Sequence, residues 1–158
     1  MTIITRYTPA DREVTEKLIA ELQDDLHAME PEIIAPGEIA ASYLQCIVDR
    51  NEKTQGMIYL ASQDGHVIGM IAVRVDGDPD EVAPHLYISD IVVTESARNQ
   101  GIGTRLLEQA QDYARKLGLV HLKIGTLPKN LVAYHLYAKF GFQDYAMIMR
   151  KKLTWTKK

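Results

Sequence analysis

Two glycines, Gly101 and Gly103, stand where an apolar, strand-like run ends and a long amphipathic run begins. If the second run forms a helix, the main-chain N–H groups of its first turn have no partner within the helix and carry partial positive charge. Glycine removes the side chains that would keep a bulky anion away from those groups. Arg98 and Arg105 flank the pair, and their guanidinium groups suit phosphate oxygens. The stretch therefore predicts a phosphate-binding loop.

The spacing in this loop does not match two common phosphate-binding motifs. A P-loop requires Lys and then Ser or Thr after its last glycine, and no such pair follows Gly103. The dinucleotide motif requires a third glycine where Leu106 stands, and an acidic residue after a second strand, where residues 119–123 have none. A tight strand-to-helix turn without a ligand is the alternative that the glycines alone leave open.

The elements that must position this loop follow from periodicity and turn residues. Helices are expected after Thr8, after Gly37, from Gly101 to Gly118 and over residues 130–140. Strands are expected over residues 2–7, 57–62, 66–75, 85–94, 119–125 and 142–152. The order β-α-α-β-β-β-α-β-α-β predicts an α/β fold with a central mixed sheet, whose strands are parallel only where a helix crosses between them. No linker divides the chain, so we expect a single domain over residues 1–158.

Length and composition limit the class of protein. The chain has 158 residues, 46% of them hydrophobic, which fits one globular domain. The single cysteine, Cys46, excludes an internal disulfide and any multi-cysteine metal site, and we expect it in the core. No run approaches the roughly 20 apolar residues of a membrane span, and the N-terminus lacks a signal-peptide pattern. We therefore expect a cytoplasmic protein with no membrane partner.

Charge is divided unevenly along the chain. Residues 1–97 hold 6 Lys or Arg and 18 Asp or Glu, whereas residues 98–158 hold 12 and 3. This division favours an anion on the second part and a cation on the first, and solvated helix faces with a lysine-rich tail are the alternative. The net charge of −3 does not favour nucleic acid as a partner. No short His, Asp or Glu spacing predicts a metal site.

Three features together resemble the GCN5-related N-acetyltransferase (GNAT) superfamily, whose members bind acetyl-coenzyme A (acetyl-CoA). The loop Arg98-x-x-Gly101-x-Gly103 resembles the signature Q/R-x-x-G-x-G/A, and the strand before it resembles the family's fourth strand. The run from Asn130 to Phe142 resembles the segment N-x-x-A-x-x-x-Y-x-x-x-G-F. The predicted element order matches along the whole chain. The resemblance implies the GNAT fold, in which the fourth and fifth strands of the central sheet splay apart.

The resemblance also implies which residues bind acetyl-CoA. The main chain of the fourth strand is expected to pair with the pantetheine arm, and the N–H groups of the glycine loop with the pyrophosphate. Arg98 adds a phosphate contact, Asn130 a hydrogen bond to the cofactor, and Tyr137 lies near the thioester sulfur. The expected cofactor residues are Ile91, Val92, Val93, Arg98, Asn99, Gln100, Gly101, Ile102, Gly103, Thr104, Asn130 and Tyr137.

Acetyl transfer to an amine needs a deprotonated amine, a polarised carbonyl and a proton for the leaving thiolate. A free main-chain N–H of Val92 or Val93 suits the charge that grows on the thioester oxygen. The Tyr137 hydroxyl suits the general acid, with a half-buried packing role as the alternative. Asp90 is expected to contact the amine or to relay its proton. Its alternative role is a surface carboxylate paired with an arginine.

The acceptor side is expected between the first two helices, where the family varies with its substrate. Residues 23–32 form an acidic run that attracts cations, and a solvated helix end is the alternative. We expect Asp24, Asp25 and His27 to bind substrate together with Asp90, whereas Ile33 and Ile34 are expected to pack locally.

These observations predict an acetyl-CoA-dependent N-acetyltransferase that uses no metal. Its acceptor is expected to be the primary amine of a small, cationic molecule, which attacks acetyl-CoA directly. Two alternatives remain open at this point: a protein or peptide N-acetyltransferase, and a non-catalytic acyl-CoA sensor. The sequence also leaves open a homodimer.

Overall fold

The structure is a computed structural model and describes residues 1–155. Five strands form one sheet in the order β1-β2-β3-β4-β5. They are β1 (Thr2–Arg6), β2 (Met57–Gln63), β3 (His66–Asp76), β4 (His85–Val93) and β5 (Leu122–Ile124). The first four strands pair antiparallel with their neighbours, and β5 joins β4 in parallel after the α3 crossover. The predicted α/β fold with a mixed sheet is therefore confirmed.

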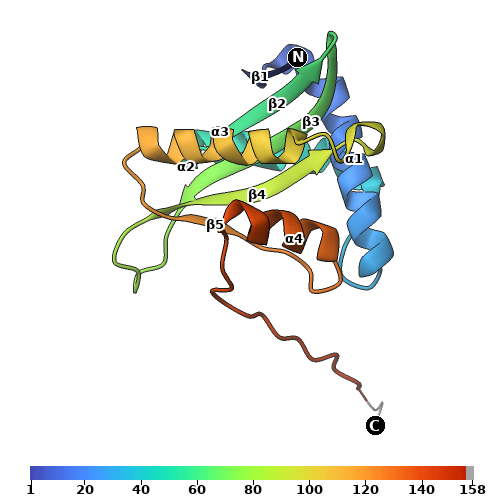
Figure 1. Cartoon of the computed structure of the whole chain (residues 1–158). Coiled ribbons are helices and arrows are strands. Elements are labelled where there is room, and N and C mark those ends of the chain that lie inside the picture. Colours follow the sequence, from blue (N-terminus) through green and yellow to red (C-terminus); the bar gives the residue numbers. More distant parts are fainter. Residues whose placement is uncertain (156–158) are drawn as a thin grey trace.

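Helices cover both faces of this sheet (Figure 1). They are α1 (Arg12–Met29), α2 (Ala40–Thr54), α3 (Ile102–Lys116) and α4 (Leu131–Phe140), with short 3₁₀ turns over Pro9–Asp11, Gly37–Ile39 and Glu95–Ala97. Side chains of α1 and α2 form one core cluster with one face of the sheet, whereas α3 and Tyr137 of α4 belong to the cluster on the other face. No helix within residues 1–155 is long and apolar enough to cross a membrane.

The central strands β2, β3 and β4 pack against helices on both faces, because alternate side chains of a strand point to opposite sides of the sheet, whereas the edge strand β1 is largely exposed. In β2, Ile58 and Leu60 pack under α1 and α2, whereas Tyr59 and Ala61 pack under α3. This two-sided burial explains why the strand sequences are nearly continuous apolar runs.

Local sequence sets the ends of the elements that were predicted from turn signals. Asp64 and Gly65 adopt φ values of 50° and 80° between β2 and β3, as a tight hairpin turn requires. Thr8 starts the first helical segment, where its N–H and hydroxyl both donate to the Asp11 carboxylate at 2.8 Å. Gly118 ends α3 with φ 72°.

The feature that creates the site is a gap between β4 and β5. The two strands pair only from Leu86 to Ile88 on β4, and β4 then continues to Val93 with no strand partner on that side in the described part of the chain. On its other side β4 stays paired with β3 as far as Val93, with a register shift at Ala72/Val73. The predicted splay is thus present, and it exposes one main-chain edge of residues 89–93.

Two expectations about the chain are wrong. Residues 142–152 form no strand, because strand-forming residues only favour an extended chain, and pairing depends on tertiary contacts that the local sequence does not specify. Met147, Ile148 and Met149 are accordingly exposed. Cys46 is exposed as well, instead of buried in the core. It precedes the buried Ile47 by one residue, which turns its side chain about 100° around the helix towards solvent.

Candidate active site

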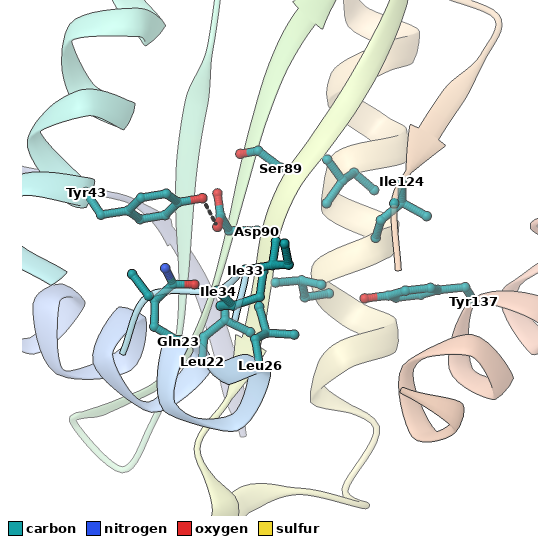
Figure 2. A pocket seen from close by; sticks show the side chains of 14 residues that line it. Leu22, Gln23, Leu26, Ile33, Ile34, Tyr43, Ser89, Asp90, Ile124 and Tyr137 are labelled. Atoms are coloured by element: carbon teal, nitrogen blue, oxygen red, sulfur yellow. Dashed lines mark hydrogen bonds between the residues drawn. The ribbon is translucent and has the colours of Figure 1, made fainter. Parts of the chain in front are cut away.

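A cavity of about 320 Å³ lies against the open part of β4 (Figure 2). One wall comes from α1, the α1–α2 connection and α2, and the other from β4, the end of β5 and α4. Its lining residues are Leu22, Gln23, Leu26, Ile33, Ile34, Ala35, Tyr43, Ile88, Ser89, Asp90, Ile91, Ile124, Gly125 and Tyr137. The cavity therefore contains both residues that the sequence assigned to catalysis, Asp90 and Tyr137.

Asp90 is a buried carboxylate with one unused oxygen. The side chain is 6% exposed, and Oδ1 accepts a hydrogen bond from the Tyr43 hydroxyl at 2.7 Å. Oδ2 is buried and has no hydrogen-bond partner within residues 1–155. Burial raises the pKa of Asp90, and the hydroxyls of Ser89 and Tyr43 and the nearby charges of Arg50 and Arg74 only partly oppose this shift. A carboxyl with a raised pKa in a cavity has the property that a general base requires.

Tyr137 lies on the opposite wall, and Figure 2 shows its hydroxyl directed towards the cavity. The residue is 8% exposed, and its ring packs edge-on against Phe142. Burial raises the pKa of Tyr137 to about 12, so the hydroxyl keeps its proton at neutral pH. A protonated phenol beside a cavity can act as a proton donor to a reacting group there.

The exposed edge of β4 presents the main chain of two particular residues. The Thr94 N–H donates to the Ile68 carbonyl of the β3 segment, and alternate residues of an antiparallel strand direct their main-chain groups to the same neighbour. The main chain of Val92 therefore faces β3, whereas Ile91 and Val93 face the gap. The Val93 carbonyl already accepts a hydrogen bond from the Arg98 guanidinium at 3.0 Å.

The phosphate-binding loop predicted around Gly101 and Gly103, called the anion loop below, leads from β4 into the N-terminus of α3. Asn99 and Gly101 have φ values of 61° and 77°, a left-handed conformation that turns the chain sharply into the helix. Gly103 in the first turn lies against α4, and a Cβ there would stand 3.0 Å from Leu136 Cδ2. Ile102 is buried, whereas Gln100 and Arg105 are exposed and Thr104 is half-buried. No side chain caps the N-terminus of α3 within residues 1–155.

Arg98 ties this loop to α1 rather than standing free. Its guanidinium donates to Glu21 at 3.1 Å and to Asp25 at 2.9 Å. The Glu21 carboxylate also accepts from the Thr94 hydroxyl at 2.9 Å and from the Glu95 N–H at 2.7 Å. Glu21 thereby fixes the start of the anion loop on the helix that forms the cavity wall.

The predicted substrate residues Asp24, Asp25 and His27 do not line the cavity, whereas Gln23 and Leu26 of the same run do. Asp24 accepts a hydrogen bond from the Gly37 N–H at 2.7 Å, Asp25 pairs with Arg98, and His27 Nδ1 contacts the Ile34 carbonyl. Asn130 caps α4, where its side-chain oxygen accepts from the Ala133 N–H at 3.3 Å. These side chains therefore hold local structure together.

Sequence reasoning missed two residues of the site and misjudged two others. Tyr43 fits the apolar stripe of its helix, and nothing in the sequence links it to Asp90, 47 positions away. Glu21 is one of many carboxylates in the first part of the chain. Ile33 and Ile34 were expected to pack locally but line the cavity. The sequence did contain a signal for these two residues. They are apolar and lie between two prolines in an otherwise acidic connection, which indicates that they contact something other than solvent.

Comparisons with known proteins identify the family. The acetyltransferase (GNAT) family profile matches residues 18–142, and the chain belongs to this family. It is 25% identical to the D-amino-acid N-acetyltransferase HPA3 of Saccharomyces cerevisiae over 149 residues, which cover 94% of this chain and 89% of that protein. It is 36% identical to the streptothricin acetyltransferase of Streptomyces lavendulae over 80 residues, 46% of this chain and 42% of that protein.

Solved structures share the fold. The apo aminoglycoside antibiotic 6′-N-acetyltransferase of Acinetobacter haemolyticus superposes with a TM-score of 0.70 at 17% identity, over 96% of this chain and 99% of that chain. At this identity the likeness shows the GNAT fold alone. The three proteins named here carry different acceptors in their names, so the acceptor must be argued from the cavity itself.

Proposed function

We propose that this protein transfers the acetyl group of acetyl-CoA to the primary amine of a small molecule by direct attack. Family membership supports acetyl transfer, and the names of relatives include N-acetyltransferases of small amines. The observation that carries the proposal is the cavity between Asp90 and Tyr137. A carboxyl suited to accept a proton and a hydroxyl suited to give one lie on facing walls, beside an unpaired strand edge.

The chemistry follows from the positions of these groups. Asp90 accepts a proton from the acceptor's ammonium, directly or through one water, and the neutral amine attacks the thioester carbon. The N–H of Ile91 or Val93, which faces the gap, donates to the oxygen on which negative charge grows. When the C–S bond breaks, Tyr137 gives its proton to the thiolate. The products are the N-acetylated amine and coenzyme A, and the two side chains exchange protons with solvent before the next turnover.

The phosphates of acetyl-CoA are expected at the start of α3. The main-chain N–H groups from Gln100 to Thr104 suit the pyrophosphate because they lack partners at the helix N-terminus. Arg105 is exposed beside them and suits a further phosphate oxygen. Arg98 is already paired with two carboxylates, so we assign it the role of shaping the loop.

Release of coenzyme A from acetyl-CoA tests this proposal directly. The full chain is incubated with acetyl-CoA and a panel of small amines, amino acids and lysine-containing peptides, and free thiol is measured. We expect turnover with small amines. Turnover with peptides alone would favour the protein-modifying alternative. Stabilisation by acetyl-CoA without turnover on any amine would favour the non-catalytic sensor.

We also propose that the protein works in the cytoplasm, in keeping with its single cysteine.

We further propose that two copies of the chain associate through the segment after α4. The outer edge of β5 has no partner within residues 1–155, and such edges readily pair with another chain. The segment also exposes apolar side chains, namely Tyr145, Met147, Ile148, Met149 and Trp155. Analytical ultracentrifugation should give a particle mass of twice the chain mass of 17.8 kDa. The Ile148→Asp variant should give a lower particle mass. A wild-type particle of 17.8 kDa would contradict the association.

A further inference from the structure

The cavity wall that faces the acceptor is apolar. Leu22 and Leu26 extend from α1, and Ile33 and Ile34 extend from the α1–α2 connection, all into the same cavity (Figure 2). The opposite side adds further isoleucines from β4 and β5, namely Ile88, Ile91 and Ile124. A ligand gains free energy here by burying hydrocarbon, at a rate that grows with each methylene removed from water.

Among the described residues, 1–155, Asp90 is the only charged one that lines the cavity. The remaining polar side chains of the lining are neutral: Gln23, Tyr43, Ser89 and Tyr137. Asp90 has one oxygen without a hydrogen bond within residues 1–155, so this oxygen is available to bind the ammonium group of a ligand. A second ammonium in the same cavity would find no carboxylate, and burying an unpaired charge is costly.

The acidic run outside the cavity does not replace the missing second carboxylate. Glu30 pairs with Lys129 at 3.0 Å and with Arg150 at 2.6 Å, and Glu32 pairs with Lys152 at 2.9 Å. Asp25 is paired with Arg98, as described above. The chain's own basic residues thus pair with three of the four carboxylates of the acidic run, and the fourth, Asp24, accepts a hydrogen bond from the Gly37 N–H.

We infer that the acceptor is a monoamine with a hydrocarbon body, whose single ammonium meets Asp90 and whose body contacts the leucine and isoleucine wall. This inference rests on the proposed function and narrows its substrate class. It departs from the general expectation of a cationic small molecule, because it excludes polyamines and polycationic antibiotics as preferred acceptors. The cavity volume of about 320 Å³ lies near the lower end of ligand sites, which fits a small molecule.

Matched pairs of amines test the inference. The kcat/KM for n-hexylamine is compared with that for 1,6-diaminohexane, which has the same length and a second ammonium, and shorter n-alkylamines complete the series. We expect at least a tenfold preference for the monoamine, and a roughly fourfold rise in kcat/KM per added methylene until the cavity is filled. Equal or better use of the diamine would overturn the inference and leave the proposed function intact. Failure of every amine would refute the proposed function itself.

A variant of the wall provides a second test. Ile33 is 62% exposed although it lines the cavity, so Ile33→Asp adds a carboxylate without emptying the core. We expect this change to move the monoamine-to-diamine ratio at least tenfold towards the diamine. Ile3→Asp, on the distant and exposed β1, is the matched control and should leave the ratio unchanged. Acetyl-CoA should stabilise both variants as it does the wild type, which verifies that each is folded. An unchanged ratio in a folded Ile33→Asp variant would contradict the inference.

Discussion

The Tyr43 hydroxyl donates a 2.7 Å hydrogen bond to one oxygen of the Asp90 carboxylate, and the other oxygen has no partner within residues 1–155. A buried polar atom without a partner is costly to stability. Where such an atom belongs to a carboxylate in a cavity wall, a cationic ligand relieves that cost on binding. The pair thus links the stability of the free protein to recognition of its acceptor.

Replacing Asp90 by Asn should lower activity and raise stability at neutral and higher pH. Burial raises the pKa of Asp90 in the folded state above its pKa in the unfolded chain. The contribution of Asp90 to stability is therefore complete at a pH below the unfolded-state pKa, and it is lost as the pH rises through the folded-state pKa. The amide keeps an acceptor for Tyr43 and carries no charge, so Asp90→Asn escapes this loss. Thermal unfolding at pH 4 to 9 should show a Tm difference that grows with pH. Asp49→Asn, on the exposed surface of α2, is the control; a constant difference would contradict the burial argument.

Tyr43→Phe should move the acidic limb of the pH profile to higher pH. The Tyr43 hydrogen bond favours the ionised form of Asp90 and lowers its pKa, as do the charges of Arg50 and Arg74. Its loss therefore raises that pKa further, and a base is active only above its pKa. The measurement is kcat/KM against pH for wild type and variant. If the two acidic limbs coincide, Asp90 is not the group that accepts the proton.

Tyr137→Phe should lower kcat by about two orders of magnitude or more, because general acid catalysis contributes 10²- to 10⁴-fold. The ring and its contact with Phe142 remain, so acetyl-CoA affinity should change little. Single-turnover kinetics separate chemistry from product release. Tyr134→Phe, one turn earlier and exposed, is the matched control. A single-turnover rate within about threefold of wild type would assign Tyr137 to packing, since even the lower limit of general acid catalysis is larger.

Gly101→Val should abolish stabilisation by acetyl-CoA. A ligand at about 100 times its Kd adds about 2.7 kcal/mol to the free energy of unfolding, or roughly 5–10 °C in Tm for a chain of this size. Gly118→Val is a close control, because Gly118 also has a left-handed φ, of 72° against 77° for Gly101, and open space around its Cα. Both variants should lose similar intrinsic stability, and only Gly118→Val should keep the shift. Retention of the shift in both would place the phosphates elsewhere.

Glu21→Ala should weaken acetyl-CoA binding without removing any expected cofactor contact. The carboxylate accepts hydrogen bonds from the Thr94 hydroxyl, the Glu95 N–H and Arg98, and three such bonds contribute on the order of 2–3 kcal/mol. We expect a lower Tm together with a higher Kd for acetyl-CoA, measured by calorimetry. Glu13→Ala removes an exposed pair with Lys17 and should change neither quantity. An unchanged Kd in Glu21→Ala would show that the loop holds its shape without this anchor.

Much of the fold could be predicted because local rules determine it. The glycine loop, the hairpin at Asp64 and the long amphipathic helix each depend on residues that are near one another in sequence. The strand expected over residues 142–152 is absent because residue type only favours a strand, whereas its pairing depends on tertiary contacts that no local pattern specifies. Cys46 was misplaced for a related reason: small apolar residues occur on either side of a helix.

The site was harder to predict because its pairs are distant in sequence. Asp90 and Tyr137 could be identified from position in a motif, but the link from Asp90 to Tyr43 depends on how α2 packs against the sheet. The acidic run illustrates the same limit. Its charges are evident in the sequence, whereas their pairing with Arg98, Arg150 and Lys152 appears only when distant segments are brought together.

The cavity draws its two walls from separate stretches of the polypeptide. The acceptor wall of leucines and isoleucines lies within residues 22–43, and the strand edge, anion loop and Tyr137 all come after residue 88. Substitutions among the apolar wall residues of the earlier stretch can therefore re-specify which amine is taken, as long as Asp25 still pairs with Arg98 and Tyr43 with Asp90. Varying only these wall positions, with Asp25 and Tyr43 kept, would be a direct route to new acceptors on an unchanged catalytic frame.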